Sequence, residues 1–164
     1  MLTKIITIGV YGFSAEGFFQ ALRTAEVDTF CDLRARRGVR GSTYAFANSR
    51  RLQDRLAQMD IAYVHRKDLA PSKDIRQRQY AEDKANKIAK RKRTELGSAF
   101  KNAYAEAVLS DFDPRSFSDE LPPDARVVAL FCVEKEPAAC HRSLVAHKLQ
   151  QGLDLPVEHI MPES

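Results

Sequence analysis

The chain has 164 residues, a formal net charge of +4 and three cysteines, and 44% of its residues are hydrophobic. This length supports one domain with a full core, and an odd number of widely spaced cysteines argues against a disulfide framework and for a reducing compartment. The apolar run at the start is too short for a signal peptide and no segment is long enough to span a bilayer, so we expect a cytoplasmic protein with a single α/β domain over residues 1–164.

The first predicted strand, over residues 3–9, leads into a glycine-containing turn. Gly9 and Gly12 lie in this turn, and a helix follows over residues 14–24. A glycine-rich turn between a strand and a helix is where α/β proteins hold phosphates. This turn lacks the GxGxxG pattern, so the signal is weak, but both glycines are candidates for anion binding.

The second predicted strand, over residues 27–33, ends in two charged residues. Asp32 and Arg34 lie on one face at its carboxyl end, where they form either a simple salt bridge or an acid and a guanidinium directed at a ligand. The next elements are a loop, a helix and a third strand, over residues 35–49, 50–59 and 61–65. His65, at the end of that strand, either reaches the same crevice or is a partly buried structural histidine.

Residues 73–93 are polar and rich in lysine. They belong to a region, residues 34–93, with 18 Lys and Arg and 6 Asp and Glu, a balance of +12 against −8 for the rest of the chain. Large apolar residues are few here, so we predict a lysine-rich helical insertion that projects from the domain or is mobile. Such segregated charge predicts nucleic-acid binding, with a solvated charged surface as the alternative. The candidate nucleic-acid-binding residues are Lys87, Lys90, Arg91, Lys92 and Arg93.

The last third of the chain contains the most informative stretch. Residues 94–109 keep one apolar stripe at helical spacing, and residues 110–125 are predicted to be loop by composition. Residues 127–133 are an unbroken apolar run, which suits a central parallel strand covered on both faces. A helix is predicted from Pro137, with Gly152 at the left-handed position just past its end. The last strand covers residues 157–160.

Chemically useful side chains gather at the junction between this apolar strand and its helix. A helix N-terminus attracts anions and lowers the pKa of a nearby thiol, so Cys140 is a candidate nucleophile, with packing as the alternative. Cys132, inside the apolar strand, is more typical of the core. His141 and Arg142 either add to the positive field or pair with nearby glutamates. No metal site is predicted, because a seven-residue gap followed by adjacent Cys-His lacks the paired spacing of structural zinc sites.

Strands that alternate with helices predict a three-layer, Rossmann-like α/β fold with a mostly parallel five-stranded sheet. With strands numbered along the chain, the expected order is 3-2-1-4-5, which reverses between strands 1 and 4. Ligands of such sheets bind in the crevice at the carboxyl ends of the strands at this reversal. The first turn, the end of the second strand and the junction after the fourth are therefore expected to converge.

Several stretches share motifs with a known family. They are TIGVYGFSAEGFFQAL at 7–22, CDLRARRG at 31–38, Phe46, IAYVH at 61–65 and ALFCVEKEPAACHRSLVAHKL at 129–149. Through them the chain resembles the domain of unknown function 488 family over most of its length, and the C-x-E-K…CHR pattern is the most specific part. The resemblance implies an α/β fold and a shared site at Asp32, Arg34, Cys132, Glu134, Cys140, His141 and Arg142. It implies no reaction.

Three functions fit these features. The first is an enzyme that acts on a nucleotide or nucleic-acid substrate. Its catalytic residues would be Asp32, Glu134, Cys140 and His141, and its anion-binding residues Arg34, Arg142, Gly9, Gly12 and Cys132. The second is a non-catalytic nucleotide- or nucleic-acid-binding module or sensor, and the third is a thiol-redox protein that uses Cys140. The sequence identifies no cofactor and no oligomeric state.

Overall fold

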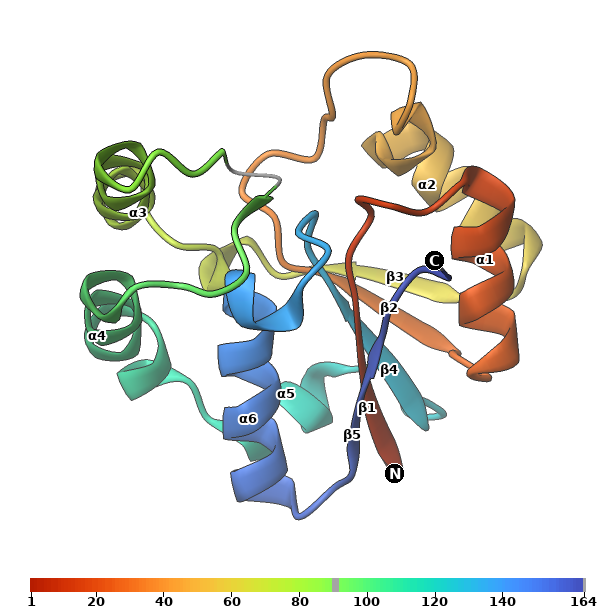
Figure 1. The fold of residues 1–164 in the computed structure, drawn as a ribbon. Helices are drawn as coiled ribbons and strands as arrows, with labels where there is room; N and C mark the ends of the chain where they lie inside the picture. The colour runs from red at the N-terminus through yellow and green to blue at the C-terminus, as the bar shows by residue number, and fades with distance from the viewer. Residues whose placement is uncertain (90–91, 164) are drawn as a thin grey trace.

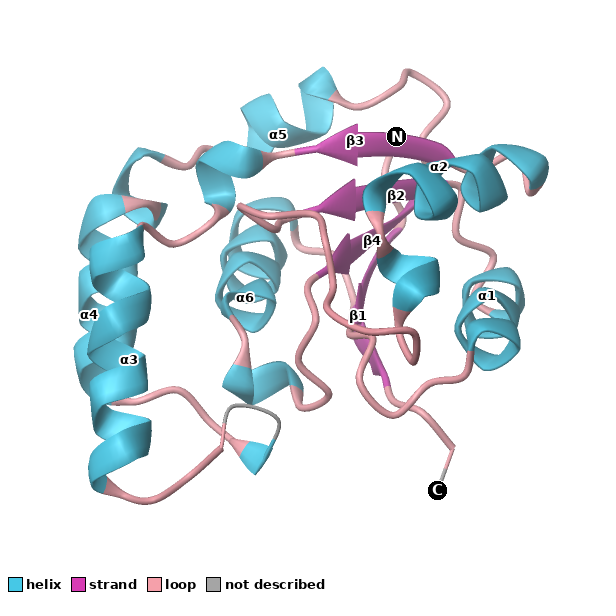
Figure 2. Ribbon diagram, turned by 90° about the horizontal axis from the view of Figure 1, so that it is seen from above, coloured by secondary structure: helices cyan, strands magenta, loops and turns pink. Residues whose placement is uncertain are grey.

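The computed structural model describes residues 1–89 and 92–163 and contains a five-stranded parallel sheet between two helical layers (Figures 1 and 2). The strands are β1 (Lys4–Ile8), β2 (Thr29–Asp32), β3 (Ala62–His65), β4 (Val127–Phe131) and β5 (Val157–Ile160). The helices are α1 (Ala15–Thr24), α2 (Ser49–Gln58), α3 (Lys73–Ala85), α4 (Ser98–Ala107), α5 (Pro114–Glu120) and α6 (His141–Leu153). The predicted three-layer α/β fold class is confirmed.

The strand order is β3-β2-β4-β1-β5, so the expected order 3-2-1-4-5 is wrong in placing β1 beside β2. β4 lies between them, and Phe131 pairs with Ile8 of β1 and with Asp32 of β2. This central place agrees with the apolar run of β4, which is buried from Val128 to Phe131. The order was missed because interior parallel strands all have the same apolar pattern, which does not specify their neighbours.

The predicted convergence of three segments holds despite the different order. The carboxyl end of β4 lies beside those of β1 and β2. The turn after β1 is joined to the β4–α6 junction, because the backbone N–H groups of Val10 and Tyr11 donate to the Val133 carbonyl at 3.0 and 3.1 Å.

Each face of the sheet has its own core. α1 and α2 cover one face, where Phe18, Phe30 and Phe131 pack with ring centroids 5.0–6.3 Å apart. α4, α5 and α6 pack on the other face, with Tyr104 and Val145 fully buried. α3 lies alongside α4 at the outer edge of this second layer (Figure 2). α3 is the helix predicted in the basic insertion, and Lys90 and Arg91 lie outside the described residues.

Two predictions about the last third of the chain are wrong. The predicted loop over residues 110–125 contains α5, which Asp113 caps by accepting a hydrogen bond from the Ser116 N–H at 3.2 Å. α6 continues through Gly152, and Asp154 takes the left-handed position with φ 54°. Gly152 serves packing instead, because a Cβ there would lie 2.5 Å from Cγ of Pro114.

Among residues 1–89 and 92–163, no helix is long and apolar enough to cross a membrane.

Candidate functional site

A cleft of about 630 Å³ opens where β2 and β4 end, a volume typical of ligand sites. Its walls are the loop after β2, one side of α3 and the β4–α6 junction. The cationic lining residues are Arg34, Arg36, Arg40, Lys73, Arg76 and Arg93. Among the described lining residues, Glu134 is the one carboxylate. The cleft is therefore strongly positive.

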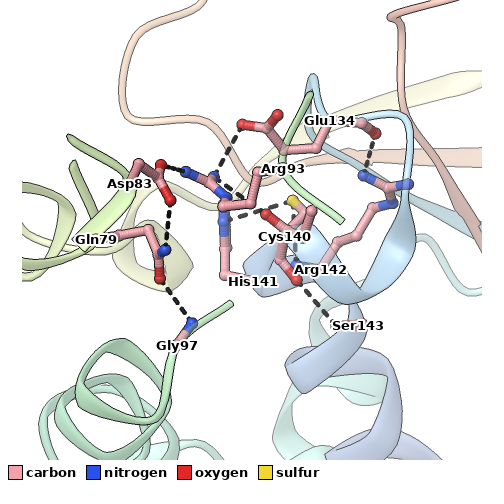
Figure 3. Close-up of polar contacts among 10 residues, drawn as sticks. Gln79, Asp83, Arg93, Gly97, Glu134, Cys140, His141, Arg142 and Ser143 are labelled. Atoms are coloured by element: carbon pink, nitrogen blue, oxygen red, sulfur yellow. Dashed lines mark hydrogen bonds and ion pairs between the residues drawn. The ribbon is translucent and has the colours of Figure 1, made fainter. Parts of the chain in front are cut away.

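The β4–α6 junction brings two sulfurs and an imidazole together on the cleft wall, and Figure 3 shows two of the three side chains, those of Cys140 and His141. One ligand atom from each of Cys132, Cys140 and His141 lies within 4.8 Å of the other two. Cys140 is the N-cap of α6, and its Sγ accepts a hydrogen bond from the Arg142 backbone N–H at 3.5 Å. The seven residues between the cysteines fold back through a 3-10 turn at Pro137–Ala139, which the sequence spacing did not reveal.

The orientation of His141 follows from its two neighbours. Nε2 lies 3.1 Å from the carbonyl oxygen of Leu33, which only accepts, so Nε2 carries a hydrogen. Nδ1 lies 3.8 Å from Sγ of Cys140 and faces that sulfur. The side chain is therefore held with its second nitrogen directed at the thiol.

The pKa values of the Cys132 and Cys140 thiols are shifted in opposite directions. Burial alone raises the pKa of Cys140, but a hydrogen bond from the Cys132 thiol and the charges of His141 and Arg142 together lower this pKa well below its ordinary value. The pKa of Cys132 is raised well above its ordinary value by donating that bond and by burial. Of the two thiols, Cys140 is therefore the one that loses its proton more readily.

Arg142 and the glycines of the first turn have structural roles. Arg142 is fully buried and donates from Nη1 to the Glu134 carbonyl at 2.6 Å and from Nη2 to the Lys135 carbonyl at 3.2 Å. Gly9 allows the same loop to approach, because a Cβ there would lie 1.8 Å from the Glu134 carbonyl oxygen. Gly12 has φ 92°. Arg142, Gly9 and Gly12 are absent from the described lining of the cleft.

Asp32 is a positioning residue for Arg34. The fully buried carboxylate accepts from Arg34 Nε at 2.9 Å and Nη2 at 2.8 Å, and from the Tyr63 hydroxyl at 2.7 Å. Burial raises the pKa of Tyr63 to about 12, so its phenol stays a donor. His65 also braces this segment, with Nε2 2.7 Å from the Arg34 carbonyl oxygen, which is the structural role considered for it. Asp32 does not line the cleft, but Arg34 does.

Arg93 belongs to a buried network rather than to an exposed basic run (Figure 3). Its Nη1 donates to Asp83 Oδ2 at 2.7 Å, and its Nη2 donates to Glu134 Oε1 at 3.3 Å and to the Ala139 carbonyl at 3.1 Å. Gln79 extends the network by donating to Asp83 Oδ1 at 2.8 Å. The network ties α3 to the β4–α6 junction.

The sequence did not single out most of the cleft's basic wall. Lys87 and Lys92 are exposed and are not among the described lining residues. The missed lining residues include Arg36, Arg40, Lys73, Arg76 and Tyr80. Lys73, Arg76 and Tyr80 lie on α3 with i, i+3, i+7 spacing, which places them on one side of a helix. This pattern was available in the sequence but is less conspicuous than the run of four consecutive cations at residues 90–93.

Searches of the curated proteins and of the solved structures gave no significant match. A comparison with protein families matched residues 14–149 to the family described as "Domain of unknown function DUF488". This match includes the loop after β2, α3 and the β4–α6 junction, which form the walls of the cleft, and it confirms the resemblance seen in the sequence. The chain therefore belongs to the DUF488 family.

Proposed function

We propose that this protein is an enzyme that acts on a nucleotide or nucleic-acid substrate and binds the phosphate of that substrate in the basic cleft. One observation carries the proposal: the cleft combines a surplus of cations with Glu134, Cys140 and His141 on the same wall. A cytoplasmic location, inferred from the number and spacing of the cysteines and from the short apolar run at the start, remains a prediction that agrees with such a substrate.

The surplus charge is available to a ligand. Arg34 is paired with Asp32, and Arg93 is paired with Asp83 and Glu134. Within the described chain, no ion pair neutralises the other four lining cations, which are Arg36, Arg40, Lys73 and Arg76. Guanidinium groups match phosphate oxygens in geometry, so this set favours a phosphate-bearing ligand.

Two further features support this ligand class. Nη1 of Arg34 is buried without a hydrogen-bond partner among the described residues, and Arg34 lines the cleft. Tyr80 lies on the same wall of α3 as Lys73 and Arg76 and is 43% exposed. An exposed aromatic ring beside cations favours stacking of a nucleobase, which contributes about 1–3 kcal/mol per base.

The chemistry is assigned to the wall formed by the junction. Glu134 and His141 are the lining groups that can move a proton, and Cys140 supplies a reactive sulfur. Asp32, which the sequence offers as a catalytic residue, is saturated by Arg34 and Tyr63 and serves to orient Arg34. Hydrolysis or group transfer at a phosphate-bearing substrate is the reaction class that this set supports.

The test of binding is fluorescence anisotropy with a labelled single-stranded oligonucleotide over a range of salt concentrations, with a mononucleotide as competitor. Four phosphate contacts give a log–log salt slope of about −2.8 on a single strand, from about −0.7 per contact. We expect joint substitution of Arg36, Arg40 and Arg76 by Ala to flatten this slope by about 2 units.

The matched control removes three exposed arginines that do not line the cleft, Arg50, Arg51 and Arg115. Equal weakening by this control, or no binding at low salt, would contradict the cleft as the binding site. Glu134→Gln then separates an enzyme from a sensor: an enzyme loses turnover of the bound substrate and keeps binding, whereas a sensor shows no turnover to lose.

A further inference from the structure

We propose that Cys132, Cys140 and His141 bind a divalent metal ion of the zinc class, with a fourth coordination position open to the cleft. This site goes beyond the proposed function: with an ion bound, Cys140 and His141 would serve as its ligands, and Glu134 would remain the lining group that moves a proton. Binding of the ion does not depend on the proposed function. It also reverses the expectation from the sequence spacing, because the fold brings together residues that the spacing keeps apart.

The distances fit a tetrahedral site. Zinc–sulfur bonds of about 2.3 Å and zinc–nitrogen bonds of about 2.0 Å place a sulfur about 3.5 Å from a nitrogen and two sulfurs about 3.8 Å apart. Cys140 Sγ and His141 Nδ1 lie 3.8 Å apart, and the three ligand atoms lie within 4.8 Å of one another. Side-chain rotations that move each atom by less than about 1 Å would close the set around an ion.

The surroundings of the ligands provide independent support. Histidines that bind metals usually donate their other ring N–H to a carbonyl or carboxylate, which fixes the tautomer. His141 does this toward the Leu33 carbonyl and leaves Nδ1 for the ion. Cys140 Sγ accepts one backbone N–H, from Arg142. The guanidinium of Arg142 is bonded to two carbonyls of the junction loop rather than to either sulfur.

The number of ligands indicates a reactive site rather than a structural one. Among the described residues, the group contains three potential ligands and no fourth His, Cys, Asp or Glu. Structural zinc sites are closed by four protein ligands, whereas catalytic sites keep one position for water or substrate. All three ligands line the cleft, so the open position faces the space where we place the phosphate. An ion there would polarise a phosphate oxygen or a bound water.

Cobalt gives a direct readout, because tetrahedral Co²⁺ bound by thiolates shows charge-transfer and ligand-field absorption. The reduced full-length chain would be stripped with a chelator, titrated with Co²⁺ alone, and then titrated with Zn²⁺ in competition. We expect one equivalent of Co²⁺ to bind, with thiolate-to-cobalt bands that Zn²⁺ removes. We expect Cys132→Ser, Cys140→Ser and His141→Asn each to weaken binding by about 100-fold or more, since loss of an outer-shell partner alone costs about 10–100-fold.

Cys31→Ala is the matched control, because Cys31 is the third cysteine and is buried within β2. It should bind one equivalent with an unchanged spectrum. Cys140→Ser keeps an oxygen at the N-cap, so it should retain the fold, which far-ultraviolet circular dichroism verifies. Absence of cobalt binding to the reduced protein, or binding by the three ligand variants that is as tight as binding by the unsubstituted chain, would overturn the metal site. Oligonucleotide binding that persists in such a protein would leave the proposed function standing.

Discussion

Truncation of Arg93 to alanine is expected to lower the free energy of unfolding by about 3 kcal/mol. The side chains of Arg93, Asp83 and Glu134 are 7%, 8% and 6% exposed, and the two ion pairs measure 2.7 and 3.3 Å. Breaking a buried pair by removing one partner costs about 3–5 kcal/mol, because the other charge stays buried without compensation. Glu134 has a further interaction, so the lower end of this range applies.

Urea denaturation followed by far-ultraviolet circular dichroism measures this loss. With a slope of about 2 kcal/mol per molar urea, the midpoint should fall by about 1.5 M. The matched control is Arg78→Ala. Arg78 pairs with Asp74 at 3.2 Å within α3, the helix that carries Asp83, but the side chains of Arg78 and Asp74 are 54% and 75% exposed. That change should cost no more than about 0.5 kcal/mol. If both variants lower the midpoint equally, Arg93 is solvated as part of a basic run, and the network does not stabilise the site.

Two other variants test the packing and the charges around the site. Gly9→Ala should destabilise the fold by at least about 1–3 kcal/mol in thermal unfolding, because the new Cβ would overlap the Glu134 carbonyl. The control is Gly38→Ala, which should be nearly neutral because its Cβ would lie 3.8 Å from the nearest atom. A hydrogen bond from Arg66 lowers the pKa of Asp68 in the folded protein. The pair therefore stabilises the fold at pH values above the pKa that Asp68 has in the unfolded chain, and this contribution is lost as the pH falls through the pKa of Asp68 in the folded protein. Asp68→Asn should therefore cost up to about 1 kcal/mol in urea denaturation at neutral pH and make no difference in strong acid; an equal cost at both would show that the charge is not involved.

The sequence was sufficient for the elements whose pattern is local. The strand in the apolar run and the helix predicted over residues 14–24 both appear in the structure, as β4 and as α1 with Ser14 at its N-cap. α5 was missed because serine, aspartate and proline dominate its surroundings, although Asp113-Pro114 is a helix-start signal and Phe117 supplies a buried anchor. The strand order was out of reach because register and neighbours depend on contacts between distant segments.

The same limit applies to the site. The sequence predicted that the first turn, the end of β2 and the β4–α6 junction converge, but it predicted neither α3 as a wall of the cleft nor the direction of single side chains. A run of four cations does not indicate that Arg93 turns inward, since that depends on Asp83 and Glu134, which are distant in sequence from one another. The proximity of Cys132 to Cys140 depends on a loop held by Arg142, which no spacing rule describes.

The position of β4 has a consequence for how the chain folds during synthesis. β1 and β2 share no edge in the sheet, and each forms its central pairing with β4. A nascent chain that has not yet extended to Phe131 has β2 and β3 as a pair, while β1 lacks both of its neighbours, β4 and β5. The interior of the sheet is thus completed late, when β4 inserts between strands made about 100 residues earlier. Until then the edges of β1 and β2 that pair with β4 lack their partner, so we expect the incomplete chain to aggregate more readily than the finished one.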